Sequence, residues 1–279
     1  MTNLPPIFIP TRGRVGELIT TKYIPKSYFE DGLVWLVTPP GERHDGLPTI
    51  SVPSEVADSL PAKRDWIAKE AARRGFDRHV QIDDDVRFSK NRFSPLPMDF
   101  AQAMHTFSAI LDRSGHVGAV IGSGHGFTNT RPAVSFNSAV GGVVCLYRHS
   151  AIGRNRFSHV AVQEDLHMHC SMLESGYSVA TCFVWGFDNI GIIRGRTRPG
   201  GLSGDPNYAS IDVYDRELER VVDRHPGILS ATHSAVPSKG TKPSFLRITR
   251  NYRRFATAQG LPTNDIGTWT DLKKMISRR

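Results

Sequence analysis

The sequence predicts an α/β protein with a mostly parallel central sheet flanked by helices. Short apolar segments alternate with helical patterns through the first half of the chain, which is typical of β-loop-α units. These apolar segments end in small or acidic turns, as the strands of such a sheet do. The length of 279 residues and the hydrophobic content of 39% are enough for one large core, which excludes a wholly disordered chain.

The first half of the chain carries the clearest strand and helix patterns. Residues 7–9 are apolar and run into a small-residue turn at 10–14. Residues 62–74 are rich in good helix formers and stop at Gly75, which suits a left-handed helix end. In order, the predicted elements are a strand at 7–9, a helix at 17–23, strands at 33–37 and 49–52, a helix at 62–74 and a strand at 79–82.

The second half has a more mixed pattern. Residues 98–112 place Phe100, Met104, Phe107 and Leu111 on one side of a helix, which predicts that this side is buried. Two stretches rich in Gly, Pro, Ser or Arg predict loops. In order, the predicted elements are a helix at 98–112, strands at 117–121 and 141–147, a helix at 164–174, a strand at 179–185, a loop at 194–207, a helix at 212–224, a loop at 232–244, a strand at 245–252 and a helix at 269–277.

The excess positive charge of the chain is confined to its last third. The formal net charge is +8, yet residues 1–193 contain 19 basic and 19 acidic residues. Residues 194–279 contain 16 Lys or Arg and 8 Asp or Glu. A basic segment beside a neutral body favours an anionic partner, with nucleic acid first. The alternative is a basic segment that only interacts with solvent. We therefore expect a body at 1–193 and a basic C-terminal extension at 194–279.

The hydropathy of the chain, its N-terminal residues and its cysteines lead us to expect a cytoplasmic protein without a membrane partner. No segment approaches the ~18 consecutive apolar residues of a membrane-spanning helix. Residues 1–10 lack the basic and apolar regions of a signal peptide. Cys145, Cys170 and Cys182 form no spaced pair, so we expect reduced, mostly buried thiols.

Three adjacent carboxylates follow the strand predicted at 79–82. Asp83, Asp84 and Asp85 repel one another, so a fold that clusters them usually supplies a cation. In extended backbone Asp83 and Asp85 point to the same side and can face one ion. Oxygen ligands suit Mg²⁺ or Mn²⁺, which also hold diphosphate oxygens. The alternative is a solvated acidic turn at a strand end.

The turn at 10–14 is a second candidate site for a nucleotide. Thr11 and Gly13 leave backbone groups accessible, and Arg12 and Arg14 add guanidinium groups that bind anions. The segment has the spacing of neither a P-loop nor a Rossmann fingerprint. The alternative is an ordinary turn between a strand and a helix, with surface arginines.

Arg64 lies in the first turn of the helix predicted at 62–74, one strand before the acidic cluster. A cation at this place can face a nucleotide held at the sheet edge. The alternative is a solvated helical turn. For the neighbouring Asp65 we expect an interaction with the positive end of the helix dipole.

Glu164 and Asp165 begin the helix predicted at 164–174 and form a third candidate site. One of them can act as a general base beside a reacting hydroxyl. His167 and His169 lack the i, i+4 spacing of a helical metal pair. The alternative for Asp165 and His169, which do have that spacing, is a plain side-chain pair.

Together these motifs resemble those of GT-A glycosyltransferases over about residues 5–190. In that family the loop after the first strand contacts the nucleotide, and a helix carries an Arg near the base or ribose. An Asp-x-Asp motif holds the metal and the diphosphate, and an acidic pair begins a later helix. The segments Pro-Ile-Phe-Ile-Pro-Thr-Arg-Gly-Arg at 6–14 and Gln-Ile-Asp-Asp-Asp-Val at 81–86 resemble, more narrowly, the TET-associated glycosyltransferases of bacteriophages.

The resemblance implies a UDP-sugar donor and a divalent ion, Mn²⁺ or Mg²⁺, held by Asp83 and Asp85. It implies Asp165, or its neighbour Glu164, as the catalytic base of an inverting transfer. A third metal ligand stays open between Asp188 and His233. The implied nucleotide-sugar contacts come from Pro10, Thr11, Arg12, Arg14, Arg64, Asp83 and Asp84.

The narrower resemblance implies that the acceptor is the hydroxymethyl group of 5-hydroxymethylcytosine in double-stranded phage DNA, inside the host cytoplasm. The body at 1–193 then carries the donor site and the extension at 194–279 the acceptor site. Two alternatives are a glycosyltransferase or sugar nucleotidyltransferase with a carbohydrate or other non-DNA acceptor, and a non-catalytic DNA-binding module. Phosphate contacts are expected from Arg194, Arg196, Arg198, Lys239, Lys242, Arg247, Arg250, Arg253 and Arg254.

Overall fold

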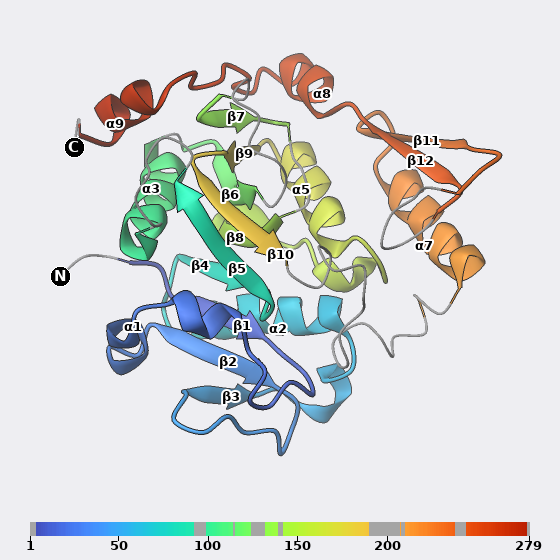
Figure 1. Cartoon of the computed structure of the whole chain (residues 1–279). Coiled ribbons are helices and arrows are strands. Elements are labelled where there is room, and N and C mark those ends of the chain that lie inside the picture. Colours follow the sequence, from blue (N-terminus) through green and yellow to red (C-terminus); the bar gives the residue numbers. More distant parts are fainter. Residues whose placement is uncertain are drawn as a thin grey trace.

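The computed structural model describes residues 4–91, 99–113, 115–123, 132–138, 142–189, 207, 210–237 and 244–277. In this part of the chain eight strands form the central sheet (Figure 1). They are β1 (Ile7–Pro10), β2 (Val34–Thr38), β3 (Thr49–Ser51), β4 (Arg78–Ile82), β6 (Val117–Ser123), β7 (Val134–Phe136), β8 (Gly142–Arg148) and β9 (Ser178–Cys182).

The strand order across the sheet is β3-β2-β1-β4-β8-β6-β9-β7. β1 pairs in parallel with both β2 and β4, with Ile7 opposite Val34 on one side and Val80 on the other. β8 runs antiparallel between β4 and β6, and β7 runs antiparallel at the edge. The other six strands share one direction, so the predicted α/β class with a mostly parallel sheet is confirmed.

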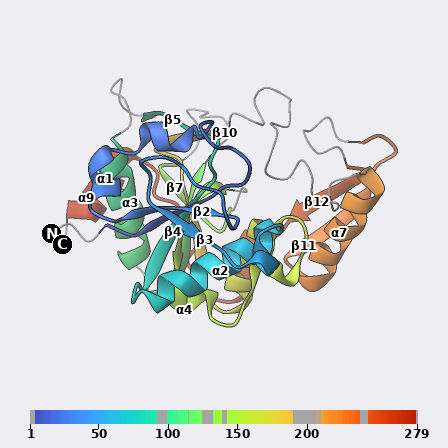
Figure 2. The same cartoon turned by 90° about the horizontal axis from the view of Figure 1, so that it is seen from below.

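Helices cover both faces of the sheet because side chains alternate between the faces along each strand. Phe8 packs with α2, and Tyr147 of β8 packs with α4 and α5, on one face. Ile9 and Leu146 pack with α1 and α3 on the other (Figures 1 and 2). The bounds of these helices are α1 (Lys26–Glu30), α2 (Leu60–Arg73), α3 (Phe100–Arg113), α4 (His149–Ile152) and α5 (Glu164–Glu174), with 3-10 turns η1 (Thr20–Tyr23), η2 (Ser54–Val56) and η3 (Phe157–His159).

Local sequence explains where α2 begins and ends. The Ser59 hydroxyl accepts the Ala62 N–H at 3.3 Å, and Pro61 occupies the first turn, where no backbone donor is needed. Gly75 has φ +86°, a conformation that L side chains rarely adopt, and it turns the chain out of the helix. α2 is thereby fixed beside β4, which positions Arg64 near the end of that strand.

The remaining elements pack around this sheet. β5 and β10 form an antiparallel pair over the face that carries α1 and α3, while β11 and β12 form a separate hairpin beside α7. Their bounds are β5 (Val86–Asn91), β10 (Trp185–Asn189), α7 (Ile211–Arg224), β11 (Leu229–His233), β12 (Leu246–Arg250), α8 (Tyr252–Ala258) and α9 (Trp269–Ser277).

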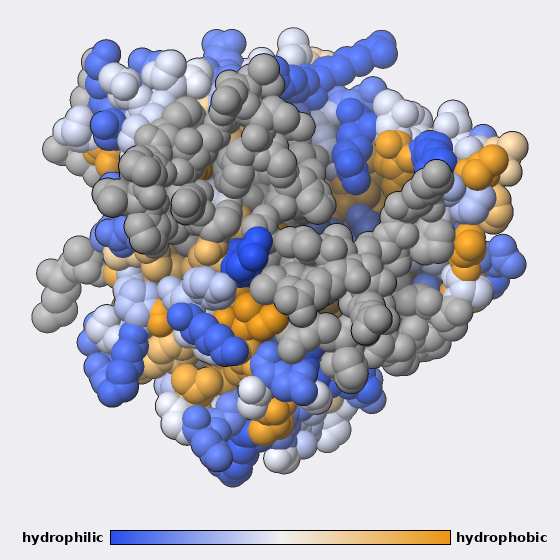
Figure 3. Space-filling view, viewed as in Figure 1, coloured by the Kyte–Doolittle hydropathy of each residue, from blue (hydrophilic) through white to orange (hydrophobic). Residues whose placement is uncertain are grey.

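The C-terminal elements share hydrophobic clusters with the rest of the molecule. Val221 of α7, Leu229 of β11 and Tyr252 of α8 are buried in the cluster that contains Leu166 of α5. Leu272 of α9 is buried in the cluster that contains α3. None of the helices in the described residues has the length and apolarity that a membrane crossing requires. On the face shown in Figure 3, hydrophilic residues cover much of the visible surface and apolar residues show as small patches between them.

The structure corrects several predicted elements. The helix predicted at 17–23 is only the 3-10 turn η1, because the Thr20 side chain bonds to another part of the backbone. The strand predicted at 179–185 divides into β9 and β10, which belong to different sheets. The loop predicted at 232–244 begins with the end of β11. The three cysteines are free and buried, as predicted.

Candidate active site

The aspartates 83–85 form a turn between β4 and β5, at the edge where the parallel strands end. The Thr20 hydroxyl donates to the Asp83 carbonyl at 2.5 Å and accepts the Val86 N–H at 2.9 Å. The Asp83 N–H donates to the Val143 carbonyl of β8 at 3.1 Å. Contacts within the protein therefore hold the backbone of this acidic turn from both sides.

The loop after β1 meets the acidic turn. The Thr11 hydroxyl donates to Asp84 Oδ2 at 2.6 Å. The Arg14 guanidinium pairs with Asp84 and lies 3.3 Å from Asp85 Oδ2. Lys63 Nζ, from the first turn of α2, donates to the Thr11 carbonyl at 2.9 Å. These segments meet because β1 and β4 are parallel neighbours, so their carboxyl ends lie together.

The other predicted residues of this loop lie on either side of Thr11. Pro10 ends β1 and is buried. Arg12 forms an ion pair with Asp58 at 3.0 Å, and its side chain is 38% exposed. Gly13 has φ +65°, and its N–H donates to Glu42 Oε2 at 2.7 Å. Arg12 is thus directed to the outer side of the loop, away from the carboxylates that Arg14 contacts.

Arg64 links the acidic turn to the predicted acidic pair. Its side chain is 7% exposed. Nη2 donates to Asp83 Oδ1 at 2.9 Å, Nε to Glu164 Oε1 at 3.0 Å and Nη1 to Gln81 Oε1 at 3.0 Å. One planar guanidinium thus holds two carboxylates from distant parts of the chain at fixed places.

A buried polar chain lies behind Arg64 and orients it. Because a guanidinium only donates, the Gln81 oxygen faces Arg64 and the Gln81 amide donates to His79 Nε2 at 2.9 Å. The other ring nitrogen, Nδ1, then donates to His149 Nε2 at 2.7 Å. Burial lowers the pKa of His79 well below its usual value, which agrees with this neutral ring.

The predicted acidic pair begins α5. Glu164 is 7% exposed and accepts from Arg64, whereas Asp165 is half-buried and its Oδ1 accepts the Leu166 N–H at 2.8 Å. Gln163, just before the pair, has the left-handed conformation φ +55°, ψ +43°, which is uncommon for a residue with a side chain. Its amide donates to the Tyr214 hydroxyl of α7 at 2.9 Å. The C-terminal part of the chain therefore holds the residue that precedes the acidic pair.

Burial shifts the pKa values of the ionisable groups around the acidic turn. Burial raises the pKa of Asp83 to about 6, against the opposing effect of Arg64. Burial also raises the pKa values of Asp84 and Asp85. Burial lowers the pKa of Lys63 to about 8. Burial therefore disfavours the charged forms of these carboxylates and of Lys63, and a cation bound beside the carboxylates would stabilise their ionised forms.

The residues present fit a divalent cation that is completed by ligands from a substrate. Arg64 donates to Asp83 Oδ1 and Arg14 lies beside Asp85 Oδ2, which leaves the second oxygen of each carboxylate outside these two ion pairs. Both are hard oxygen ligands of the kind that Mg²⁺ and Mn²⁺ prefer. Over the described ranges, no group of three or more His, Cys, Asp or Glu side chains is arranged to hold a metal.

The two candidates for a third metal ligand lie in different places. His233 stands 3.2 Å from Glu219 of α7, and its side chain is 73% exposed, so it belongs to the β11–β12 hairpin. Asp188 is in β10 and its backbone lies opposite Arg87, two residues beyond Asp85. Register therefore places only Asp188 next to the acidic turn.

The expectation for Asp65 is wrong. Its carboxylate accepts the Phe157 N–H at 2.7 Å and the Ser158 N–H at 3.1 Å, so it binds η3 rather than the first turn of its own helix. Long-range backbone donors outcompete the helix dipole because they form direct charge-assisted hydrogen bonds. Asp65 thereby fixes α2 against the segment that leads into α5.

Some of the predicted DNA contacts can be placed and others cannot. Arg247, Arg250 and Arg254 are exposed. Arg253 pairs with Asp265 at 2.6 Å and donates to the Ser135 hydroxyl at 2.7 Å, so it is engaged within the protein. The contacts predicted for Arg194, Arg196, Arg198, Lys239 and Lys242 lie outside the described residues.

Several residues of the site were not among the sequence predictions. Gln81 was a detectable signal, because a polar residue beside Ile82 in a buried strand needs a partner. Thr20, Gln163 and Tyr214 carry no such signal, because each acts on a partner far away in the sequence.

Comparison with known proteins identifies the family. No curated protein matches the chain. Among solved structures, A197 from STIV is similar with 10% identity and a TM-score of 0.39, covering 66% of this chain and 84% of its own. A Bacillus anthracis protein provisionally assigned as a glucose-1-phosphate thymidylyltransferase has 13% identity and a TM-score of 0.41, covering 67% and 89%. A Desulfovibrio desulfuricans G20 protein provisionally assigned as a nucleotide-diphospho-sugar transferase has 15% identity and a TM-score of 0.35, covering 78% and 96%.

At these scores the solved structures carry no argument about activity, and we base the family on the sequence match. The profile of the TET-Associated Glycosyltransferase family matches residues 5–197. This range includes the loop after β1, the acidic turn, Arg64 and the acidic pair of α5. The chain therefore belongs to the TET-associated glycosyltransferase family and is a glycosyltransferase.

Proposed function

We propose that the protein transfers a sugar from a UDP-sugar to the hydroxymethyl group of 5-hydroxymethylcytosine in double-stranded DNA, with Mn²⁺ or Mg²⁺ as cofactor. The observation that carries the proposal is that the two acidic motifs meet at Arg64. Glu164 accepts a hydrogen bond from its guanidinium at 3.0 Å, and Asp83 accepts one at 2.9 Å. A donor diphosphate placed at the acidic turn is then next to the residues that act on the acceptor.

The donor half of the site is assigned by charge and position. Asp83 and Asp85 would hold the divalent ion, which when bound neutralises the diphosphate leaving group. Thr11, Arg14 and Asp84 form one hydrogen-bonded unit, to which we assign the nucleotide side of the site.

Asp165 is the better candidate for the general base. Glu164 is buried and its carboxylate accepts from Arg64, so its role is to position that guanidinium. Asp165 is half-buried, and its Oδ2 accepts no hydrogen bond within the described residues. In an inverting transfer this oxygen takes the proton of the acceptor hydroxyl as the new bond forms.

The DNA acceptor is supported by the charge of the C-terminal extension. Residues 194–279 carry the whole positive excess of the chain, beside a neutral body. Duplex DNA is a dense line of negative charge, so such a segment suits it better than it suits a neutral carbohydrate.

The test is a transfer assay with purified full-length protein. Several UDP-sugars are supplied with Mn²⁺ or Mg²⁺, and the acceptors are 5-hydroxymethylcytosine duplex DNA, unmodified duplex DNA and small carbohydrates. Digestion to nucleosides and mass spectrometry measure the added hexose or pentose. We expect a mass increase only on 5-hydroxymethylcytosine, and its loss in Asp83→Asn.

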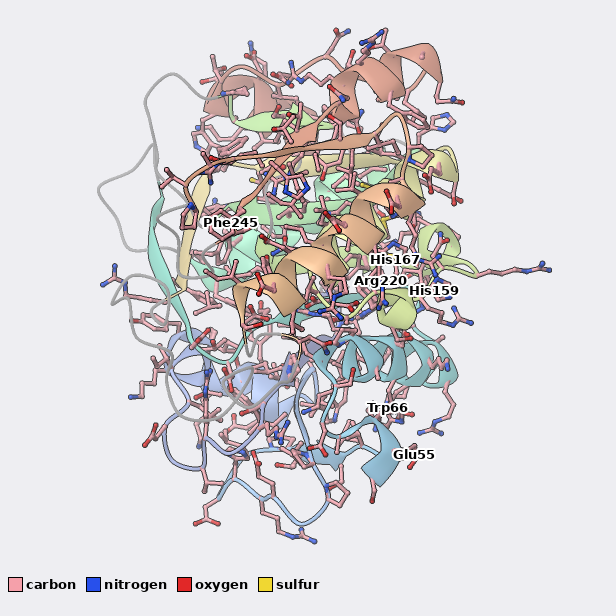
Figure 4. The ribbon with its side chains drawn as sticks, turned by 90° about the vertical axis from the view of Figure 1, so that its right-hand side faces the viewer. Glu55, Trp66, His159, His167, Arg220 and Phe245 are labelled. Carbon is pink, nitrogen blue, oxygen red and sulfur yellow. The ribbon has the colours of Figure 1, made fainter. Side chains whose placement is uncertain are left out.

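Glu55→Gln is the matched control, because Glu55 is exposed in η2 and this change removes one carboxylate charge, as Asp83→Asn does (Figure 4). Glu55→Gln is expected to retain wild-type transfer. Transfer to a carbohydrate but not to DNA refutes the proposed acceptor. Full activity after chelation of divalent ions refutes the proposed cofactor.

A further inference from the structure

β11 and β12 form a two-stranded ribbon whose faces differ in chemistry. The antiparallel register places Ser230 opposite Thr249 and Thr232 opposite Arg247. Opposite residues and residues two apart along a strand share a face, so these four side chains lie together. All four are exposed. We call this surface the open face of the ribbon.

The other face of the ribbon is covered by α7. Leu246 is buried in a cluster with Tyr214 and Leu218, and Ile248 packs against it. The Asp215 carboxylate accepts the Phe245 N–H at 2.9 Å, at the start of β12. Figure 4 shows α7, marked by Arg220, beside the ribbon. α7 therefore fixes the orientation of the ribbon and leaves the open face to solvent.

Charge separates the ribbon from its supporting helix. Between Asp223 and Asp265 the chain has no Asp or Glu and seven Lys or Arg. α7, in contrast, has five acidic and three basic residues. Within the described part of the chain, no carboxylate pairs with Arg247, Arg250 or Arg254. Among these arginines Arg247 lies on the open face, whereas Arg250 is opposite Leu229 on the other face, and Arg254 follows in α8. The open face thus carries one arginine, with further positive charge beside it.

We propose that the open face of this ribbon docks in the major groove of the duplex that carries the acceptor base, an inference that rests on the proposed function. Two strands about 4.8 Å apart fit a groove about 12 Å wide. Ser and Thr hydroxyls and Arg are the groups that bind phosphates and base edges there. The hydroxymethyl group of the modified cytosine also projects into the major groove, because C5 is on that edge of the base.

Neighbouring residues of α7 connect this surface to the catalytic helix α5. Tyr214 accepts from Gln163, the residue before the acidic pair, while Asp215 holds the start of β12. The ribbon is therefore attached, through less than one turn of α7, to the N-terminus of the helix that carries Asp165. A duplex docked on the open face is held at the same end of the molecule as the proposed base.

The test uses the full-length ribbon variant Arg247→Glu and the charge-matched control Arg216→Glu, an exposed arginine on α7. Fluorescence anisotropy measures binding of a labelled 20-base-pair duplex across a salt series. We expect the ribbon variant to lose more than tenfold in affinity and to show a log–log salt slope smaller by about one. Arg216→Glu is expected to stay within twofold of wild type.

A second readout separates this inference from the proposed function. The ribbon variant is expected to lose transfer to duplex DNA while it keeps wild-type UDP-sugar binding by calorimetry. If the wild type transfers to DNA and the ribbon variant binds and transfers equally well, the ribbon inference is wrong. It is also wrong if Arg216→Glu weakens binding as much as the ribbon variant does. If the wild type neither binds duplex DNA nor modifies it, the proposed function fails first.

Discussion

Replacing Arg64 by Met is expected to lower the free energy of unfolding by about 3–5 kcal/mol, because this removes one partner of a buried ion pair. The guanidinium makes three hydrogen bonds of 2.9–3.0 Å and its side chain is 7% exposed. The change leaves Glu164 buried and unpaired, and Gln81 without its donor. Because the Asp83 side chain is 28% exposed, water compensates part of its loss, and we expect a value near the lower end, about 3 kcal/mol.

Equilibrium unfolding in urea, followed by circular dichroism, measures this loss. Thermal melts are expected to shift by roughly 6–12 °C, at about 2–4 °C per kcal/mol for a protein of this size class. The control is Arg73→Met, on the same helix, because Arg73 pairs with Glu70 at 2.7 Å but its side chain is 71% exposed. That change is expected to leave the free energy of unfolding close to the wild-type value, because solvent screens an exposed ion pair. If the two variants lose the same free energy, Arg64 does not support the site as the hydrogen bonds imply.

Three further predictions concern catalysis, acid stability and packing. Asp165→Asn is expected to reduce transfer by about 10²–10⁴-fold while calorimetric UDP-sugar affinity is retained, and unchanged turnover would rule out Asp165 as the base. Burial lowers the pKa of His169 from 6.5 to about 3, so its neutral form is stable in the folded protein, and the associated stability is lost as pH falls below the unfolded value. Between pH 7.5 and pH 5 this protonation lowers the free energy of unfolding by about 2 kcal/mol. In His169→Gln, urea unfolding should show a free energy of unfolding that changes less with pH over this range. Gly142→Ala is expected to cost about 1–3 kcal/mol, because the new Cβ meets Ile121 Cγ2 at 2.1 Å, whereas Gly115→Ala has open space and should unfold at nearly the wild-type urea concentration.

The main parts of the candidate site could be predicted from the sequence to the extent that their positions in the fold follow from topology. Runs of apolar residues predict the strands that end just before Thr11 and Asp83. A parallel sheet places the carboxyl ends of such strands at one edge. The helix that carries Arg64 is readable from composition, and the acidic pair from its place at a helix start. The structure adds that these groups are joined by direct hydrogen bonds.

The rest depends on contacts between distant parts of the chain. The sequence around Thr20 resembles a short helix, but the Thr20 hydroxyl donates to the carbonyl of Asp83, 63 residues further along the chain. The left-handed conformation of Gln163 is paired with Tyr214, 51 residues away. Local propensity carries no information about such partners. The expectation for Asp65 was wrong for the same reason, because its carboxylate accepts a hydrogen bond from the distant Phe157 N–H.

The family match ends at residue 197, but the folding unit does not. Val221, Leu229 and Tyr252 complete the apolar cluster under α5, and Leu272 completes the one under α3. A chain cut at the family boundary would expose those apolar surfaces to water. The region that we assign to the acceptor therefore cannot be exchanged without disturbing the packing of the rest of the fold. Its inner surfaces are part of the scaffold that holds the candidate donor site, so substitutions there would also disturb that site.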